Sequence, residues 1–215
     1  LVEAVTEWAV DRDLWVMIDE SYADLVLPPA RHVHPVECRA DAADRVVSVR
    51  SFSKSFSVTG WRVGYLYGPA PVVAAARSLQ THLTSHAPSV LQHALVPAAE
   101  GAADDDVEAT VARIGGRLAV VEEGLAGLPE LRWERPAGGF YLFLDCRALL
   151  GRTYHGVRVA TTGELTERLV TDAGVAVTSG AAFGAEGYVR MSLTADEGDL
   201  AEACARIGEF VGHGR

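Results

Sequence analysis

The chain has 215 residues, of which 49% are hydrophobic, so it can bury a substantial core in one large domain or two small ones. Its formal net charge of −10 argues against nucleic acid or an anionic membrane surface as a main partner, and no apolar run is long enough to span a membrane. Three widely spaced cysteines (Cys38, Cys146 and Cys204) argue against a disulfide framework and a cysteine-based metal site, and favour a reduced, cytoplasmic compartment.

The first seventy residues show one helical pattern and three strand patterns. Residues 1–9 have helical apolar spacing without the features of a signal peptide, so we expect further protein upstream. The apolar run at 14–18 predicts a strand buried on both faces, and residues 45–49 and 62–67 predict two more. Only about a dozen residues separate the second strand from the third, which leaves no room for a crossover helix, so the third strand should run antiparallel.

This topology brings polar side chains to one edge of the predicted sheet. The carboxyl ends of the first two strands and the amino end of the third coincide there. Asp19, Lys54 and Arg62 are therefore expected at one crevice, the usual ligand position in open α/β sheets.

The segment 28–44 is predicted to be a loop because it contains prolines, histidines and charged residues. His32 and His34 form an H-x-H pair in it. No acid or third histidine lies at a suitable spacing, so the pair indicates a solvated loop and no metal site is expected.

The rest of the chain is predicted to contain three helices followed by a smaller α+β unit. The helices cover 70–84, 88–99 and 104–127. The strands of the α+β unit cover 131–134, 140–145, 175–177 and 188–193. Capping-box patterns at 161–164 and 194–197 predict two further helix starts. We therefore expect residues 1–103 to belong to a large sheet domain, and residues 104–215 to form a connecting helix and a small domain.

The side chains expected at the crevice suit one cofactor. Lys54 lies in a partly apolar setting that favours the neutral amine, which forms Schiff bases with aldehydes. Asp19 can hold a protonated ring nitrogen, and the Tyr22 phenol can hydrogen-bond a ring oxygen. Hydroxyl groups at 51 and 53 and the Arg62 guanidinium suit a phosphate. These are the groups needed to hold pyridoxal phosphate.

Five motifs resemble the signature of the class I/II aminotransferases of pyridoxal-phosphate fold type I. They are DESY at 19–22, SFSK at 51–54, TGWRVG at 59–64, GGFY at 138–141 and YVRMS at 188–192. Their order and separations fit the family, so the resemblance covers essentially the whole chain. It implies an α/β fold in which part of the large α/β/α sheet domain is followed by the small C-terminal α+β domain.

The resemblance also implies roles for individual residues. Lys54 would form the Schiff base and shuttle the proton, Asp19 would keep the pyridine nitrogen protonated, and Tyr22 would bond the ring oxygen. The implied phosphate-binding residues are Ser51, Ser53 and Arg62. Arg190 would bind the substrate α-carboxylate, and Phe140 would line the pocket beside it.

The implied activity moves an amino group between an α-amino acid and a 2-oxo acid. Members of the family are about twice this length and work as homodimers, so we expect a homodimer when the protein is full length. Two alternatives stay open. One is another reaction of the same fold type, such as elimination, cyclisation or decarboxylation, because the same cofactor site serves all of these. The other is a non-catalytic aminotransferase-like module.

Overall fold

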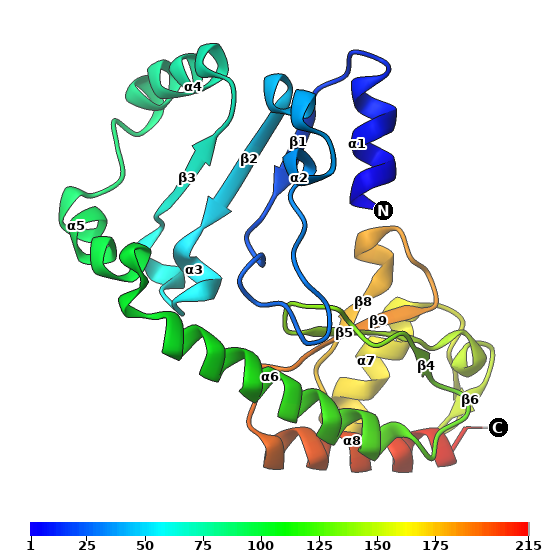
Figure 1. The fold of residues 1–215 in the computed structure, drawn as a ribbon. Coiled ribbons are helices and arrows are strands. Elements are labelled where there is room, and N and C mark those ends of the chain that lie inside the picture. The colour runs from blue at the N-terminus through cyan, green and yellow to red at the C-terminus, as the bar shows by residue number, and fades with distance from the viewer. Residues whose placement is uncertain (215) are drawn as a thin grey trace. The chain divides into compact units, whose positions relative to one another are not determined.

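The computed structural model describes residues 1–214, and the chain divides into two compact units, Leu1–Thr110 and Val111–Arg215 (Figure 1). The first unit contains a three-stranded sheet, and the second contains a four-stranded sheet and a small hairpin. The division falls inside the long helix α6 (Asp104–Leu125).

The sheet of the first unit has the strand order β1-β2-β3 and confirms the predicted topology. Its strands are β1 (Val16–Asp19), β2 (Val46–Ser51) and β3 (Gly64–Tyr67). β1 runs parallel to β2, and β3 runs antiparallel to it. The carboxyl ends of β1 and β2 therefore share one edge of the sheet with the amino end of β3.

Three helices predicted for the first unit are confirmed, at α1, α4 and α5. The helices are α1 (Val2–Val10), α2 (Pro35–Cys38), α3 (Phe52–Ser55), α4 (Ala70–Leu83) and α5 (Ser89–Pro97). Two short 3-10 turns, η1 (Ala40–Asp44) and η2 (Thr59–Trp61), and one π-helical turn, η3 (Ala98–Ala102), complete the unit. The prediction of a loop over 28–44 is wrong at α2 and η1, because His34 caps a short helix that the composition of the segment did not reveal.

One face of β1 is open. Met17 is 74% exposed and Trp15 is 61% exposed, whereas Val16 and Ile18 are half-buried. The expectation of a strand buried on both faces is therefore wrong within residues 1–214. No part of these residues covers most of the face that carries Met17. The apolar run was correct as a strand signal, but it did not report what covers the strand.

The second unit is built on an antiparallel sheet of order β4-β5-β9-β8. Its strands are β4 (Arg132–Trp133), β5 (Tyr141–Asp145), β8 (Thr178–Ser179) and β9 (Tyr188–Ser192). A hairpin of β6 (Thr153–Tyr154) and β7 (Val157–Arg158) lies outside this sheet. The helical elements are α7 (Thr162–Ala173), α8 (Glu197–Gly212) and the turns η4 (Arg147–Leu149) and η5 (Gly180–Phe183).

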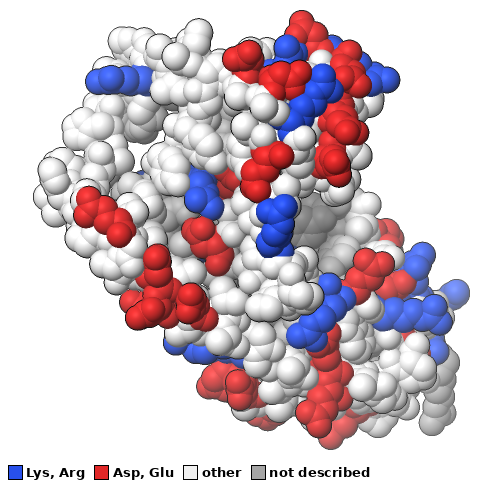
Figure 2. Space-filling view, in the orientation of Figure 1, with Lys and Arg blue, Asp and Glu red and all other residues white. Residues whose placement is uncertain are grey.

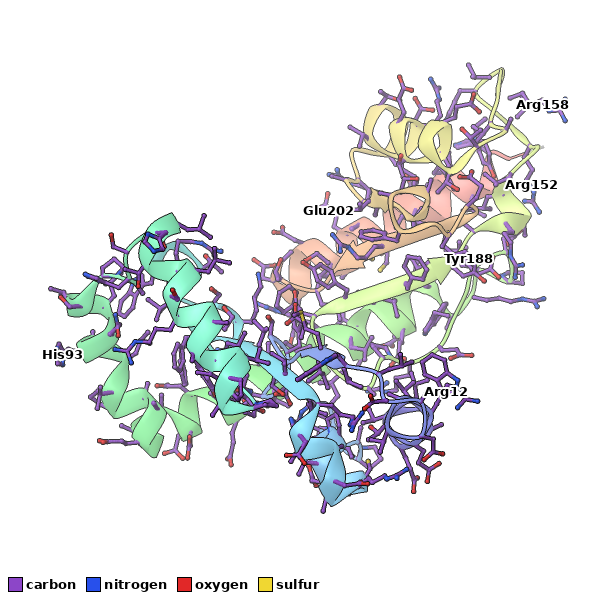
Figure 3. The ribbon with its side chains drawn as sticks, turned by 90° about the horizontal axis from the view of Figure 1, so that it is seen from above. Arg12, His93, Arg152, Arg158, Tyr188 and Glu202 are labelled. Atoms are coloured by element: carbon purple, nitrogen blue, oxygen red, sulfur yellow. The ribbon has the colours of Figure 1, made fainter. Side chains whose placement is uncertain are left out.

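The core of this unit consists of apolar side chains from α6, β5, β9, α7 and α8. Fully buried members of this core are Leu118, Val121, Leu125, Leu142, Leu165 and Leu193. At the rim of the sheet, Tyr188 stands on β9, where its ring stacks on Phe143 of β5 (Figure 3). Arg158 points away from the unit at the end of the β6–β7 hairpin (Figure 3).

The two predicted capping boxes have different outcomes. At α7, the Thr161 hydroxyl accepts a hydrogen bond from the Glu164 amide, and the Glu164 carboxylate accepts one from the Thr161 amide, which confirms the box. At α8, the predicted box at 194–197 is wrong. Asp196 caps the helix by accepting from the Asp199 amide, and the Thr194 hydroxyl bonds to Ser192 instead.

The strand predicted over 175–177 lies two to three residues later, at β8. α7 ends in a left-handed Gly174, and the Val175 amide donates back to the Leu169 carbonyl. This hydrogen bond completes the helix cap, so the Val175 amide is not available to a β-ladder. Val175 is buried, which explains why it has the apolar character of a strand residue.

Charged side chains of both signs are interspersed over the α1–η1 region of the first unit (Figure 2, upper right). Three ion pairs account for much of this pattern, joining Arg39 to Asp11 and Asp41, and Arg45 to Asp13. Two of them, Arg39–Asp11 and Arg45–Asp13, connect the residues after α1 with the two ends of η1, at the edge of the sheet where β1 and β2 begin.

Candidate active site at the strand ends of the first unit

Register places Asp19 and Ser51 on the same face of the sheet. Asp19 is aligned with Val49, and Ser51 follows two residues later in β2, opposite Gly64 of β3. Because side chains alternate along a strand, Asp19, Val49 and Ser51 share one face. Both polar residues lie at the carboxyl ends of their strands, as the sequence predicted.

Lys54 lies on the short helix α3, directly after β2. Ser51 caps α3, and its hydroxyl accepts a hydrogen bond from the Ser53 amide at 3.1 Å. The Phe52 amide donates to the Val63 carbonyl at 3.3 Å, which ties α3 to the segment before β3. Ser53 is buried and Lys54 half-buried, so α3 holds the lysine at the sheet edge.

Arg62 adopts a left-handed backbone conformation, with φ 54° and ψ 44°. This conformation is unfavourable for residues other than glycine, so it places strain at this position. The guanidinium donates to the Thr59 carbonyl at 3.0 Å. Among the ion pairs formed within residues 1–214, none involves Arg62, so its charge is not used by a carboxylate there.

The Asp19 carboxylate is held in its ionised form by its own turn. The Ser21 hydroxyl and the Ser21 amide both donate to Asp19 Oδ1, at 2.5 and 2.9 Å, and these bonds lower the pKa of Asp19. Tyr22 follows in the same turn and is half-buried, and its carbonyl accepts from the Leu25 amide. An ionised carboxylate at a strand end can hold a protonated ring nitrogen.

The H-x-H pair is wrongly predicted as solvated. His32 Nε2 lies 2.5 Å from Glu20 Oε1, and His34 Nε2 lies 2.8 Å from Ser48 Oγ. Glu20, whose side chain is 2% exposed, also accepts from the Tyr67 hydroxyl at 2.5 Å. The histidines therefore anchor the loop to the sheet. Their partners lie 12 to 14 residues away in sequence, which the local pattern does not reveal.

Glu20 gives the first unit a pH-dependent stability. Burial acts to raise the pKa of Glu20, but hydrogen bonds from Tyr67 and His32 outweigh it, and the pKa lies below the ordinary 4.5. A depressed pKa stabilises the fold above the unfolded-state value, and this contribution is lost as pH falls through the folded-state value. We expect Glu20→Gln to cost about 2 kcal/mol of unfolding free energy near neutral pH.

The difference between wild type and Glu20→Gln should narrow as the pH falls through the folded-state pKa of Glu20, which lies below 4.5, because the wild-type carboxyl then becomes protonated too. Urea unfolding at a series of pH values measures this difference. A gap that stays constant down to the acid end of the series would contradict the assignment to Glu20.

The second unit contains the remaining predicted site residues, Arg190 and Phe140. The Arg190 guanidinium carbon lies 4.2 Å from the Tyr141 ring centre and 4.5 Å from that of Phe183, so two rings enclose it. Phe140 is half-buried, with its ring centre 4.7 Å from that of Tyr141. Within residues 1–214, Arg190 forms no ion pair with a carboxylate.

The predicted site residues thus fall into two groups. The first unit brings six of them to one sheet edge: Asp19, Tyr22, Ser51, Ser53, Lys54 and Arg62. The second unit holds Arg190 and Phe140 on and beside the strands β9 and β5. Sequence reasoning did not single out Phe183, which lies in the turn η5 between β8 and β9.

Within residues 1–214, no group of three or more His, Cys, Asp or Glu side chains is placed to hold a metal ion. No helix in the same range has both the length and the apolar character needed to cross a membrane. Burial raises the pKa of Cys146 to about 12 and that of Cys204 to about 11, which makes these thiols unreactive.

Comparisons with known proteins agree over nearly the whole chain. The model of the family described as aminotransferase class I and II matches residues 1–207. An aspartate aminotransferase of Streptomyces avermitilis is 36% identical over 215 residues, which cover 98% of this chain and 51% of that protein. An arginine–pyruvate transaminase of Pseudomonas aeruginosa is 35% identical over 207 residues, which cover 95% of this chain and 50% of that protein.

Among solved structures, the aspartate aminotransferase of Rhizobium meliloti has a TM-score of 0.92 at 30% identity, covering 98% of this chain and 53% of that chain. The chain spans about half the length of the curated relatives it matches.

Proposed function

Since the chain belongs to the class I and II aminotransferase family, we propose that it carries the lysine-bearing part of an aminotransferase that uses pyridoxal 5′-phosphate. The proposed reaction moves an amino group from an α-amino acid to a 2-oxo acid. One observation carries the proposal. Lys54 is the only lysine in the sequence, and it lies on α3, at the sheet edge shared with Asp19 and Ser51.

The residues at this edge fit the cofactor by their chemistry. An ionised Asp19 suits the pyridine nitrogen, and the Tyr22 phenol suits the ring oxygen. The phosphate would be held by the hydroxyl groups of Ser51 and Ser53 and by Arg62, whose charge is not neutralised by a carboxylate of residues 1–214.

When bound, the cofactor supplies an aldehyde for covalent capture of amines and a ring that accepts the electrons released at the substrate Cα. Lys54 would hold the aldehyde and then take and return the proton at Cα. Asp19 would keep its negative charge beside the ring nitrogen throughout. Arg190 would bind the substrate α-carboxylate through a bidentate pair and so orient Cα.

The names of the relatives support transamination over elimination or cyclisation. The Streptomyces avermitilis and Pseudomonas aeruginosa proteins are both named for amino-group transfer. These names differ in the amino acid, so the substrate is proposed only as an α-amino acid with a 2-oxo acid as acceptor. We also propose a cytoplasmic homodimer for the full-length protein. The three cysteines, none in a disulfide, support the reducing compartment.

The aromatic pair around Arg190 predicts a substrate-binding effect. Phe183→Leu removes one of the two rings that fix the guanidinium plane, a contact worth about 0.5–1 kcal/mol at an exposed site. We expect KM for the amino acid to rise about threefold while kcat changes little, because the loss affects ground state and transition state alike. Phe183→Tyr keeps a ring and serves as the matched control, with an unchanged KM. An equal rise in both variants would contradict the role of the ring.

Transfer of isotope tests the proposed function. The chain is incubated with pyridoxal 5′-phosphate, a ¹⁵N-labelled amino acid and an unlabelled 2-oxo acid, and the products are analysed by mass spectrometry. Transamination places ¹⁵N in the new amino acid, whereas elimination releases it as ammonia. If ¹⁵N appears neither in the new amino acid nor in ammonia, the result would favour the non-catalytic module.

A further inference from the structure

We propose that Asp24 is a positioning residue for Lys54, a role that rests on the function proposed above. Asp24 lies in the turns that follow β1, two residues after Tyr22. It has no place in the cofactor chemistry, yet its carboxylate binds two different elements of the unit.

Each oxygen of the Asp24 carboxylate has its own partner. Oδ1 accepts a hydrogen bond from Arg50 Nη2 at 3.0 Å, near the carboxyl end of β2. Oδ2 accepts from the Ser55 hydroxyl at 2.6 Å, on α3. Ser55 is the neighbour of Lys54 in α3, so the carboxylate joins the turns that carry Asp19 and Tyr22 to the helix that carries Lys54.

Backbone hydrogen bonds alone hold α3 weakly. The helix has only four residues, which is too short for stability without tertiary contacts. The hydrogen bond from the Phe52 amide to the Val63 carbonyl fixes only its first residue. Ser55 is at the other end and only 6% exposed, so its hydroxyl needs a partner within the protein. Asp24 supplies that partner and fixes the end of α3.

A contribution to the free energy of unfolding does not explain the two contacts of Asp24 well. The Asp24 side chain is 42% exposed and that of Arg50 is 27% exposed, and ion pairs at such positions add little to the free energy of unfolding. The bond from the buried Ser55 hydroxyl to a charged acceptor is the stronger one, and its effect is confined to α3. A local role is therefore the one the contacts favour.

Hydrogen exchange measures this local role without the cofactor. We expect Ser55→Ala and Asp24→Ala each to accelerate amide exchange at residues 53–57 about tenfold, because each removes the same charge-assisted bond. The double variant should be no faster than the faster single variant, since the two changes share one interaction. Asp11→Ala is the matched control, because Asp11 forms a comparable exposed ion pair with Arg39 at the opposite edge of the sheet.

A second measurement follows the reaction of Lys54 with pyridoxal 5′-phosphate, fixed with borohydride at successive times. The rate should fall about tenfold in Ser55→Ala and Asp24→Ala and stay unchanged in Asp11→Ala. Unchanged exchange at 53–57, or faster exchange spread evenly over β2 and α1, would overturn the positioning role. A wild-type chain that forms no adduct would count against the proposed function, and the exchange data would still decide the role of Asp24.

Discussion

Lys54→Arg is expected to abolish the borohydride-fixed attachment of pyridoxal 5′-phosphate to this chain while leaving its fold intact. Arginine keeps the positive charge and a similar length, but its guanidinium stays protonated and is not a nucleophile. Because Lys54 is the only lysine in the sequence, an adduct on a lysine side chain can lie only there. Peptide mapping locates the adduct directly.

The effect on turnover should be at least about 10³-fold, since in the proposed function one residue supplies both the covalent attachment and the proton transfer. Arg77→Lys provides the control, because it adds an exposed lysine on α4. Random surface chemistry would modify position 77 as fast as position 54. Equal rates at the two positions would contradict selective capture of the cofactor at Lys54.

Gly180→Ala is expected to destabilise the second unit by about 3 kcal/mol, the largest stability effect that we predict. A Cβ at this position would lie 2.5 Å from the Tyr188 carbonyl oxygen and would also meet the Ala185 carbonyl oxygen. Both are backbone atoms, so no side-chain rotation relieves the clash. The backbone is also held by the bond from the Ala185 amide to the Gly180 carbonyl.

Gly127→Ala is the matched control, because a Cβ there has no neighbour within 4 Å. We expect its effect to stay within about 0.5 kcal/mol. Equilibrium urea unfolding followed by circular dichroism compares the two variants. Since Gly180 begins the η5 turn that carries Phe183, the alanine variant should also weaken amino-acid binding. Equal unfolding midpoints for both variants would show that the backbone around position 180 adjusts freely.

Sequence patterns predicted the sheet and its polar edge because both follow from the apolar runs of the strands and from the length of the loops between neighbouring strands. The loop between β2 and β3 is too short for a crossover helix, and this alone fixes the antiparallel direction of β3 and the position of Arg62. The aminotransferase fold is confirmed by the family match and by the structural similarity. The assignment of individual cofactor and substrate residues stays a prediction, as does the domain boundary at 103/104.

Contacts between distant residues were beyond the sequence patterns. Glu20 and Tyr67 are 47 residues apart, and Asp24 and Ser55 are 31 apart, so neither pair leaves a local signal. The H-x-H pair was predicted to be solvated because no acid or third histidine lies at a suitable spacing near it, whereas its partners lie 12 and 14 residues away. The exposed Met17 shows the same limit, because an apolar strand does not report which part of a protein covers it.

The left-handed backbone at Arg62 has a consequence for anyone who would redesign this chain. A design procedure that optimised folding alone would place glycine or asparagine at position 62, since both tolerate a positive φ at lower cost. The arginine therefore places a charge where the backbone costs stability, and because we propose that this charge holds the cofactor phosphate, an automated search for stabilising substitutions should leave it untouched.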